Sequence, residues 1–183
     1  MPEALGHEEL VWNAAVLLFG GIDTTEGMIV NAVRHVLGDP DALELIRGSA
    51  ELLHSAIEES IRLEPAAAVV DRYATSDVDL GGAQIRKGDL VSVSIAGANR
   101  DPAVFSEPDR FDIRRVNARV NLAFAQGPHF CLGAHVARTE TAIAIRRLVD
   151  RLPALRLDPD HPNAPRGLVF RKPPALRVSW TLR

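Results

Sequence analysis

The stretch of sequence that carries the most information is Phe124-Ala125-Gln126-Gly127-Pro128-His129-Phe130-Cys131-Leu132-Gly133. It places the only cysteine of the chain in a glycine-bearing loop, directly before an apolar pattern of helical spacing that runs to about Leu152. Unpaired backbone N–H groups and the helix dipole at such a position favour a thiolate and lower the pKa of the thiol. We therefore expect Cys131 to be a metal ligand or a nucleophile; the alternative is a small hydrophobic side chain in the core.

Outward from this loop, the spacing of apolar residues predicts a mainly α-helical chain with a small antiparallel β-sheet, an α+β fold class. Helices are expected over about 8–37, 41–46, 50–64 and 131–152, with Ser49 as an N-cap and Pro65 as the stop of the third helix. On the last helix one register contains Val136, Glu140, Ile143 and Leu148. Short strands joined by tight hairpins at Gly81-Gly82 and Lys87-Gly88-Asp89 are expected between Val69 and Ile95. An irregular stretch is expected from Asn99 to Asn121, and a final hairpin around Pro173-Pro174.

Composition and charge narrow the class of protein. The chain has 183 residues, 46% hydrophobic and 25% charged, which fits one globular domain and excludes a disordered or collagen-like chain. A net charge of -3 gives no field that would attract nucleic acid. The longest early apolar run, Ala14 to Phe19, is shorter than the roughly 20 residues of a membrane span. We expect a soluble, cytoplasmic protein that binds neither nucleic acid nor membrane.

A second motif lies in the middle of the first helix: Gly20-Gly21-Ile22-Asp23-Thr24-Thr25. Two adjacent glycines in a helix cost about 1 kcal/mol each relative to alanine, so we expect some group to approach this helix closely. Thr24 can donate to a preceding carbonyl and open a notch in the hydrogen-bond ladder. An acid beside an alcohol, Asp23 beside Thr24, suits the relay of protons there. Ordinary helix packing and a solvated acid are the alternative.

A third motif is the pair Glu59 and Arg62, three residues apart on one helix. The carboxylate and the guanidinium share a face and can form an ion pair, which contributes only about 0.2–0.5 kcal/mol if it is exposed. By themselves, these two residues predict a helix salt bridge and no chemistry.

Together the three motifs resemble the C-terminal portion of a soluble, bacterial-type cytochrome P450, a heme-thiolate monooxygenase. The proximal loop of that family reads Phe-Gly-x-Gly-x-His/Arg-x-Cys-x-Gly, which the sequence matches at Phe124, Gly127, His129, Cys131 and Gly133. It departs at Ala125, where the family usually has glycine, so the backbone there should take a conformation that an L-residue can adopt.

The resemblance runs from about Leu10 to Trp180, nearly the whole chain. A complete member of the family is much longer. We therefore expect residues 1–183 to form the C-terminal portion of one cytochrome P450 domain, without its N-terminal part.

The resemblance implies a heme b cofactor and a role for each motif. Cys131 would be the axial ligand of the heme iron, and His129 and Arg72 would bind the heme propionates. Asp23 and Thr24 would deliver protons to dioxygen. The other residues implied to contact the cofactor are Gly20, Gly21, Phe124 and Gly133.

In the family the Glu-x-x-Arg pair is buried beside the cysteine loop and has a third partner from the segment between the sheet and the loop. Our candidate for that partner is Arg110, in Pro108-Asp109-Arg110-Phe111.

Two functions follow. The first is a heme-dependent monooxygenase that inserts one oxygen atom of dioxygen into a small hydrophobic organic substrate, with electrons from a ferredoxin-type partner. Its surviving substrate contacts would be Ala67, Ala68, Val69 and Leu168 to Phe170. The second is a catalytically silent remnant, either a heme-binding half-site or an apo helical module that binds another protein through its exposed distal face.

Overall fold

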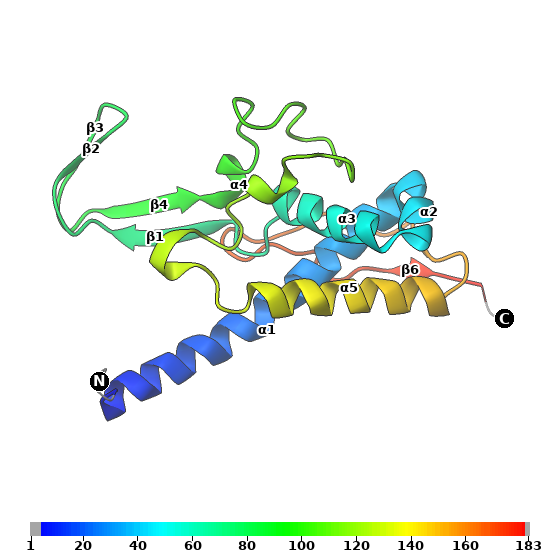
Figure 1. The fold of residues 1–183 in the computed structure, drawn as a ribbon, viewed down its shortest axis with the longest axis horizontal. Coiled ribbons are helices and arrows are strands. Elements are labelled where there is room, and N and C mark those ends of the chain that lie inside the picture. Colours follow the sequence, from blue (N-terminus) through cyan, green and yellow to red (C-terminus); the bar gives the residue numbers. More distant parts are fainter. Residues whose placement is uncertain (1–4, 182–183) are drawn as a thin grey trace.

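The computed structural model describes residues 5–181 as a helical body from which strands extend (Figure 1). The α-helices are α1 (His7–Gly38), α2 (Pro40–Gly48), α3 (Ala50–Leu63), α4 (Ile95–Ala98) and α5 (Ala134–Arg151). The strands are β1 (Val69–Tyr73), β2 (Val78–Leu80), β3 (Ala83–Ile85), β4 (Leu90–Ser94), β5 (Arg156–Leu157) and β6 (Val178–Ser179). Two short 3-10 helices, η1 (Ala118–Val120) and η2 (Gly127–His129), precede α5. The predicted fold class, mainly α with antiparallel β-structure, is confirmed.

Local capping signals explain where the helices begin. The side chain of Asp39 accepts a hydrogen bond from the backbone N–H of Ala42 at 3.0 Å, and Pro40 is the first residue of α2. Ser49 does the same for α3, accepting from the N–H of Leu52 at 3.2 Å. The predicted N-cap role of Ser49 is confirmed.

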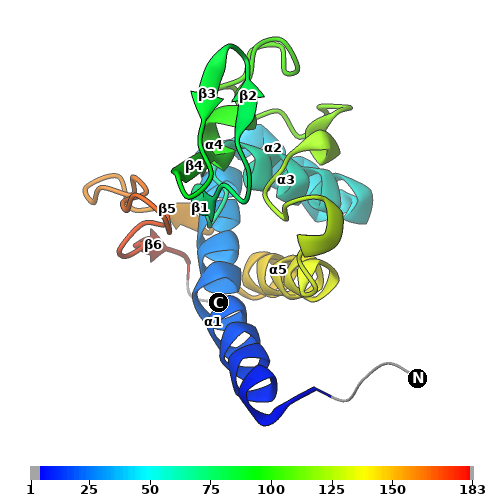
Figure 2. The same ribbon diagram turned by 90° about the vertical axis from the view of Figure 1, so that its left-hand side faces the viewer.

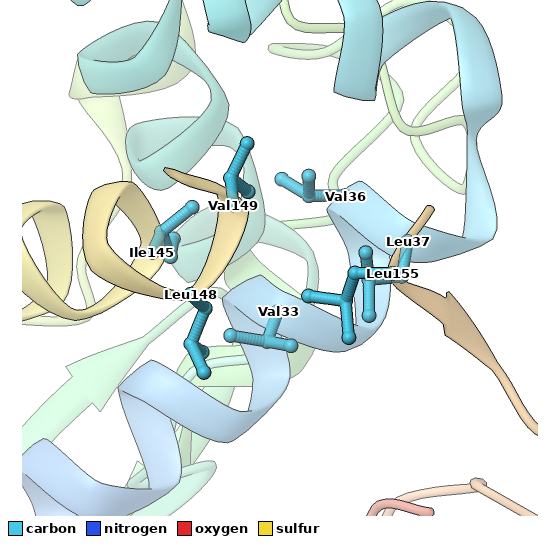
Figure 3. A pocket seen from close by; sticks show the side chains of 7 residues that line it. All are labelled: Val33, Val36, Leu37, Ile145, Leu148, Val149 and Leu155. Carbon is cyan, nitrogen blue, oxygen red and sulfur yellow. The ribbon is translucent and has the colours of Figure 1, made fainter. Parts of the chain in front are cut away.

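The core lies where the C-terminal half of α1 packs against α3 and α5. All buried residues of α1 fall between Gly27 and Leu37. Figure 3 shows the junction of α1 with α5, where the side chains of Val33, Val36, Leu37, Ile145, Leu148, Val149 and Leu155 point toward one another. They leave no space for a water molecule, so this junction is packed core and not a ligand site.

The N-terminal half of α1 extends away from the body (Figure 1), and its large apolar side chains are exposed: Leu10, Val11, Trp12, Val16, Leu17, Leu18, Phe19 and Ile22. By length and composition alone α1 could cross a membrane, with a mean hydropathy of 1.3 over its most apolar window, although a core helix of a soluble protein meets the same criterion. A continuous apolar surface of this kind is typical of a face that packs against another polypeptide or a ligand.

The strands form three separate antiparallel pairs instead of the single small sheet that we expected. β1 pairs with β4 over five residues, from Val69 opposite Ser94 to Tyr73 opposite Leu90. β2 and β3 form a hairpin whose turn, Gly81-Gly82, has φ angles of 59° and 84°. Positive φ at both turn residues suits glycine and matches the right-handed twist of the strands. This predicted hairpin is confirmed, whereas the one expected at Lys87-Gly88-Asp89 is wrong, because β4 pairs with β1 and not with β3.

The final hairpin that we expected around Pro173-Pro174 is wrong. β6 pairs with β5, and the chain reverses earlier, where Arg166 bridges Lys172 across Gly167. Gly167 has a φ of 109°, and a Cβ at this position would collide with the carbonyl oxygen of Phe170. The reversal therefore depends on this glycine rather than on the prolines.

The predicted register of the last helix does not describe its inner face. Val136 and Ile143 are 60% and 56% exposed, whereas the buried residues of α5 are Ala134, Ala137, Thr141, Ile145 and Val149. Three of these five are small, and small side chains let α5 pack closely on α1 and α3.

His35, on α1, is held in a partly buried site beside α3. Its Nδ1 lies 2.9 Å from Oγ of Ser60, and its ring stacks on Phe111 with 5.2 Å between the ring centroids. Burial lowers the pKa of His35 from 6.5 to about 3, and the positive charges of Arg34, Arg100 and Arg62 act in the same direction. The folded chain therefore keeps this imidazole neutral.

We expect acid to destabilise the fold through His35. Because its pKa is lowered in the folded state, the unfolded chain binds the proton first. The contribution of neutral His35 to the free energy of unfolding is complete above about pH 6.5 and is lost as the pH falls toward 3. By pH 5 the free energy of unfolding should have fallen by about 2 kcal/mol. Urea unfolding at pH 7.5 and pH 5 measures this difference. His35→Gln should reduce it, and His54→Gln, at an exposed histidine of α3, should not; equal effects would contradict the assignment.

Candidate functional site

Cys131 lies exposed in the loop between η2 and α5, and its thiol is free. Backbone hydrogen bonds fold the loop: the N–H of Cys131 donates to the carbonyl oxygen of Phe124 at 2.9 Å, and the N–H of Ala134 donates to the carbonyl oxygen of Cys131 at 3.3 Å. A Cβ on Gly133 would stand 3.9 Å from the sulfur. The alternative of a buried core cysteine is therefore wrong, and the sulfur stands at the start of α5.

Ala125 takes a backbone conformation that L-residues rarely adopt. Its φ is +58°, in the left-handed region, two residues before Gly127 with a φ of +74°. Ala125 therefore takes a conformation that an L-residue can adopt, as expected, but one that such residues rarely adopt. The loop keeps the left-handed geometry that the glycine of the family pattern would take without strain, and it does so at a cost of about 1–2 kcal/mol.

Ala125→Gly should stabilise the chain. Glycine removes the left-handed strain, and this gain exceeds the entropy that glycine adds to the unfolded chain, for a net gain of about 0.5–1 kcal/mol. Unfolding in urea measures it. The matched control is Ala103→Gly, at an exposed loop alanine without a positive φ, which should lower stability by about 0.5 kcal/mol. If both substitutions destabilise equally, Ala125 is not strained.

The glycine pair on α1 faces open space. Gly20 and Gly21 are exposed, and apart from their chain neighbours and the backbone of their own helix, no atom of residues 5–181 lies within 4 Å of a Cβ built at either position. As predicted, the hydroxyl of Thr24 donates to the carbonyl oxygen of Gly20, at 2.5 Å. The described part of the chain therefore does not supply the close neighbour that we expected. A close neighbour of this kind exists instead at Gly27, where a Cβ would stand 3.2 Å from Cβ of Ala66. The sequence analysis missed Gly27.

Asp23 is paired with a lysine from the other end of the chain. The Nζ of Lys172 lies 2.9 Å from Oδ1 of Asp23 and 2.9 Å from Oε2 of Glu26. The hydrogen bond with Asp23 raises the pKa of Lys172 most, and the hydrogen bond with Glu26 raises it further. The ammonium group of Lys172 therefore stays charged. The sequence analysis missed Lys172, because it lies 149 residues from Asp23 along the chain.

Glu59 and Arg62 form a fully buried ion pair on α3. The Nε and Nη2 atoms of Arg62 donate to the two carboxylate oxygens of Glu59, both at 2.8 Å, and both side chains are 0% exposed. The third partner is Arg115, whose Nε donates to Oε1 of Glu59 at 2.9 Å. Our candidate Arg110 is wrong for this role, because its guanidinium pairs with Glu107 at the surface.

Arg110 still contributes its backbone to this network. Its carbonyl oxygen accepts hydrogen bonds from Arg62 at 3.2 Å and from Arg115 at 3.3 Å. Arg62 also donates to the carbonyl oxygens of Asn99 and Pro108, at 2.9 and 2.7 Å. The buried pair thus holds the irregular segment against α3. This segment leads from α4 to the cysteine loop.

The two proposed propionate partners are exposed. Arg72 lies on β1 opposite Val91, and its Nη1 donates to the carbonyl oxygen of Asp71 at 2.8 Å. His129 is the last residue of η2. Both side chains can reach an anionic group on the outside of this body.

These elements surround one open side of the molecule. Figure 2 shows the projecting half of α1, the loop that leads into α5, and the β1–β4 pair standing around the same side. The residues there fit a heme: an exposed thiol as iron ligand, an open glycine face for a flat ring, and Arg72 and His129 for its carboxylates. The exposed apolar side chains of Phe19 and Phe130 suit the macrocycle.

A separate hollow of about 220 Å³ lies in the C-terminal segment, lined by His161, Pro162, Ala164, Arg166, Pro174, Ala175 and Arg177. It shares no residue with the three motifs. The cysteine loop and the glycine motif therefore belong to the open side and not to this hollow, whereas Glu59 and Arg62 are buried on α3.

Comparison with known proteins shows what the chain is similar to. The family model of Cytochrome P450 matches residues 29–178. The chain is 41% identical over 152 residues to the putative cytochrome P450 140 of Mycobacterium tuberculosis, an alignment that covers 83% of this chain and 35% of that protein. It is 42% identical over 174 residues to the cytochrome P450 monooxygenase PikC of Streptomyces venezuelae, covering 94% of this chain and 41% of that protein.

Two solved structures show the same architecture. The structure of CYP109E1 from Bacillus megaterium in complex with corticosterone has a TM-score of 0.91 at 31% identity, over 98% of this chain and 49% of that one. The structure of P450BioI with an acyl carrier protein ligated to hexadec-9Z-enoic acid has a TM-score of 0.88 at 36% identity, over 97% of this chain and 46% of that one. The chain thus spans less than half the length of these relatives.

Proposed function

The chain belongs to the cytochrome P450 family, and on that premise we propose that it forms the heme-binding, C-terminal part of a monooxygenase. The observation that carries the proposal is the exposed, free Cys131 in a loop closed onto the carbonyl of Phe124. The reaction proposed is the insertion of one oxygen atom of dioxygen into an organic substrate. When bound, heme b supplies the activation of dioxygen, and its cysteine ligand increases the electron density at the iron.

Each residue of the open side would hold one part of the cofactor. Cys131 would bind the iron, and Arg72 and His129 would neutralise the propionates. Gly20 and Gly21 would let the ring approach α1, because no other segment of the described chain lies within 4 Å of a Cβ at either position. Phe124 and Gly133, on either side of the cysteine, would contact the ring from the loop.

Asp23 and Thr24 would move protons on the same side of α1. The hydroxyl proton of Thr24 points at the carbonyl oxygen of Gly20, which leaves the lone pairs of Oγ1 free to accept a hydrogen bond. For Thr24 to pass a proton on, its hydroxyl must rotate away from Gly20 and release its own proton as it accepts the next one. The carboxylate of Asp23 is held by Lys172 and is half exposed to solvent. A relay through Asp23 therefore requires Lys172 to share or release this carboxylate.

The proposed substrate is a small hydrophobic molecule, which would contact two groups of residues beside α1. Ala67 bridges Phe170, and the N–H of Ala68 donates to the carbonyl oxygen of Val169 at 2.7 Å, so the two predicted groups of substrate contacts lie together. The ring of Phe170 packs edge-on against Phe19 of α1, with 5.8 Å between centroids. The proposal includes a ferredoxin-type electron donor and a cytoplasmic location.

The exposed apolar half of α1 favours a second candidate function. A chain with this face uncovered would be a heme-binding half-site or an apo helical module, completed by another polypeptide that packs on the face. The relatives contain more chain than the part that this protein matches, and we propose that equivalent polypeptide covers this face in the active enzyme.

Titration of the chain with hemin separates the two candidates. The monooxygenase proposal expects one heme per chain and, after reduction under carbon monoxide, the red-shifted Soret band of a thiolate-ligated heme. A chain that takes up no hemin supports the apo module. Uptake with a Soret band of imidazole type would contradict Cys131 as the ligand.

A further inference from the structure

Arg138 joins three parts of the molecule that lie far apart in the sequence. From α5, its Nε and Nη2 atoms donate to Oε1 and Oε2 of Glu58 on α3, at 2.6 and 3.3 Å. The face of the same guanidinium lies over the ring of Phe124 in the cysteine loop, with 4.3 Å from the guanidinium carbon to the ring centroid. The sequence analysis assigned no role to Arg138 or Glu58.

The ion pair with Glu58 fixes the plane of this guanidinium. The side chains of Glu58 and Arg138 are 6% and 27% exposed, so solvent screens their attraction less than at the surface. A carboxylate that accepts two hydrogen bonds from one guanidinium sets its orientation as well as its position. Glu58 is itself held, because the next residue, Glu59, belongs to the buried network of α3.

Phe124 connects this contact to the sulfur. Its ring packs on Arg138, and its carbonyl oxygen accepts the N–H of Cys131 at 2.9 Å. The following residue, Ala125, has a φ of +58°, so the loop between them is under backbone strain that favours rearrangement. A contact that holds the Phe124 ring therefore opposes the relaxation of the loop.

We propose that Arg138, oriented by Glu58, is a positioning residue for Cys131. It holds Phe124 through a cation–π contact and thereby fixes where the sulfur stands before α5. The inference deepens the proposed function, since it takes Cys131 as the functional atom of the loop. The contacts of Arg138 with Glu58 and Phe124 do not require heme.

Hydrogen exchange in the full chain without heme tests the positioning role. Arg138→Met should speed exchange of the Cys131 amide about tenfold, because the ring loses its cation and the loop opens more often. The amide of Glu64, which donates to the carbonyl oxygen of Ser60, should keep its rate. Arg138→Lys, which keeps the charge but not the flat bidentate group, should show most of the same increase.

The matched control is Arg146→Met. Arg146 lies on the same helix and also reaches another helix, donating to the carbonyl oxygen of Arg47 at 3.1 Å. This variant should leave the Cys131 amide unchanged. Equal acceleration in both variants, or a uniform acceleration of all amides, would reduce Arg138 to a general contributor to stability and overturn the proposal.

A double substitution tests whether Arg138 acts through Phe124. In a Phe124→Leu background, Arg138→Met should change the exchange of the Cys131 amide by less than about twofold, since the stacked ring is already gone. Additive effects would show that Arg138 acts by another route, and the proposal would fail.

The heme-loaded chain separates this inference from the proposed function. Arg138→Met should lower the fraction of thiolate-type Soret band under carbon monoxide, relative to Arg146→Met. If the loop effect appears but hemin is not taken up, the positioning of Cys131 stands and the proposed function fails. If the thiolate band forms and the loop effect is absent, the function stands and the positioning role fails.

Discussion

Cys131→Ser is expected to abolish the thiolate-type Soret band of the hemin-loaded, reduced and carbon monoxide-treated chain. A serine hydroxyl stays protonated at neutral pH and is a poor ligand for heme iron, whereas a thiolate is a strong one. The band should therefore disappear completely and not merely weaken. Absorbance spectra of the variant and the parent chain, loaded with equal amounts of hemin, measure the effect.

The fold should survive this substitution. Cys131 is exposed, and the hydrogen bonds that shape its loop use its backbone N–H and carbonyl groups, which serine retains. The free energy of unfolding in urea should change by less than about 0.5 kcal/mol. With the fold intact, an unchanged Soret band in the variant would mean that another residue binds the iron.

Glu59→Gln should have the largest effect on stability, a loss of about 3–5 kcal/mol. The substitution leaves two guanidinium groups, those of Arg62 and Arg115, without the carboxylate that both of them contact. Arg62 is 0% exposed, so water cannot replace the lost charge partner. Urea unfolding, followed by circular dichroism, measures the loss.

Glu107→Gln is the matched control for this prediction. Glu107 pairs with Arg110 at 2.9 Å, but its side chain is 70% exposed, and an ion pair of this kind contributes little. The expected loss is below about 0.5 kcal/mol. If Glu107→Gln costs as much as Glu59→Gln, the buried network does not have the role that its geometry indicates.

Local signals predicted most of the helical frame. The limits of α3 follow from a capping serine at position 49 and a proline at 65, and the turn of the β2–β3 hairpin follows from Gly81-Gly82. Each of these signals acts within a few residues of the structure it determines. This is why the sequence alone could place them.

Packing faces and distant partners could not be predicted in this way. Apolar spacing selects the large side chains of Val136 and Ile143 on α5, but close packing against α1 and α3 selects its small ones. Arg110 and Arg115 are both arginines of the same irregular segment, and only the path of the backbone decides which side chain turns toward Glu59. Composition and spacing do not distinguish them.

The candidate site likewise combines local features that the sequence reveals with long-range contacts that it does not. The chemistry of a cysteine at a helix start and of an acid beside a threonine is local, so both could be named from the sequence. The contact of Arg138 with Phe124 and the pairing of Lys172 with Asp23 join distant segments, and no sequence pattern indicated them.

The two bonds of Lys172 also bear on the order of events during synthesis of the protein. Asp23 and Glu26, three residues apart on one helix, repel each other until a cation lies between them. That cation is translated 149 residues after Asp23, on the order of ten seconds later at ribosomal speed. The nascent helix therefore carries an uncompensated pair of negative charges while the residues between Glu26 and Lys172 emerge, and Asp23 acquires its partner only after Lys172 has been translated.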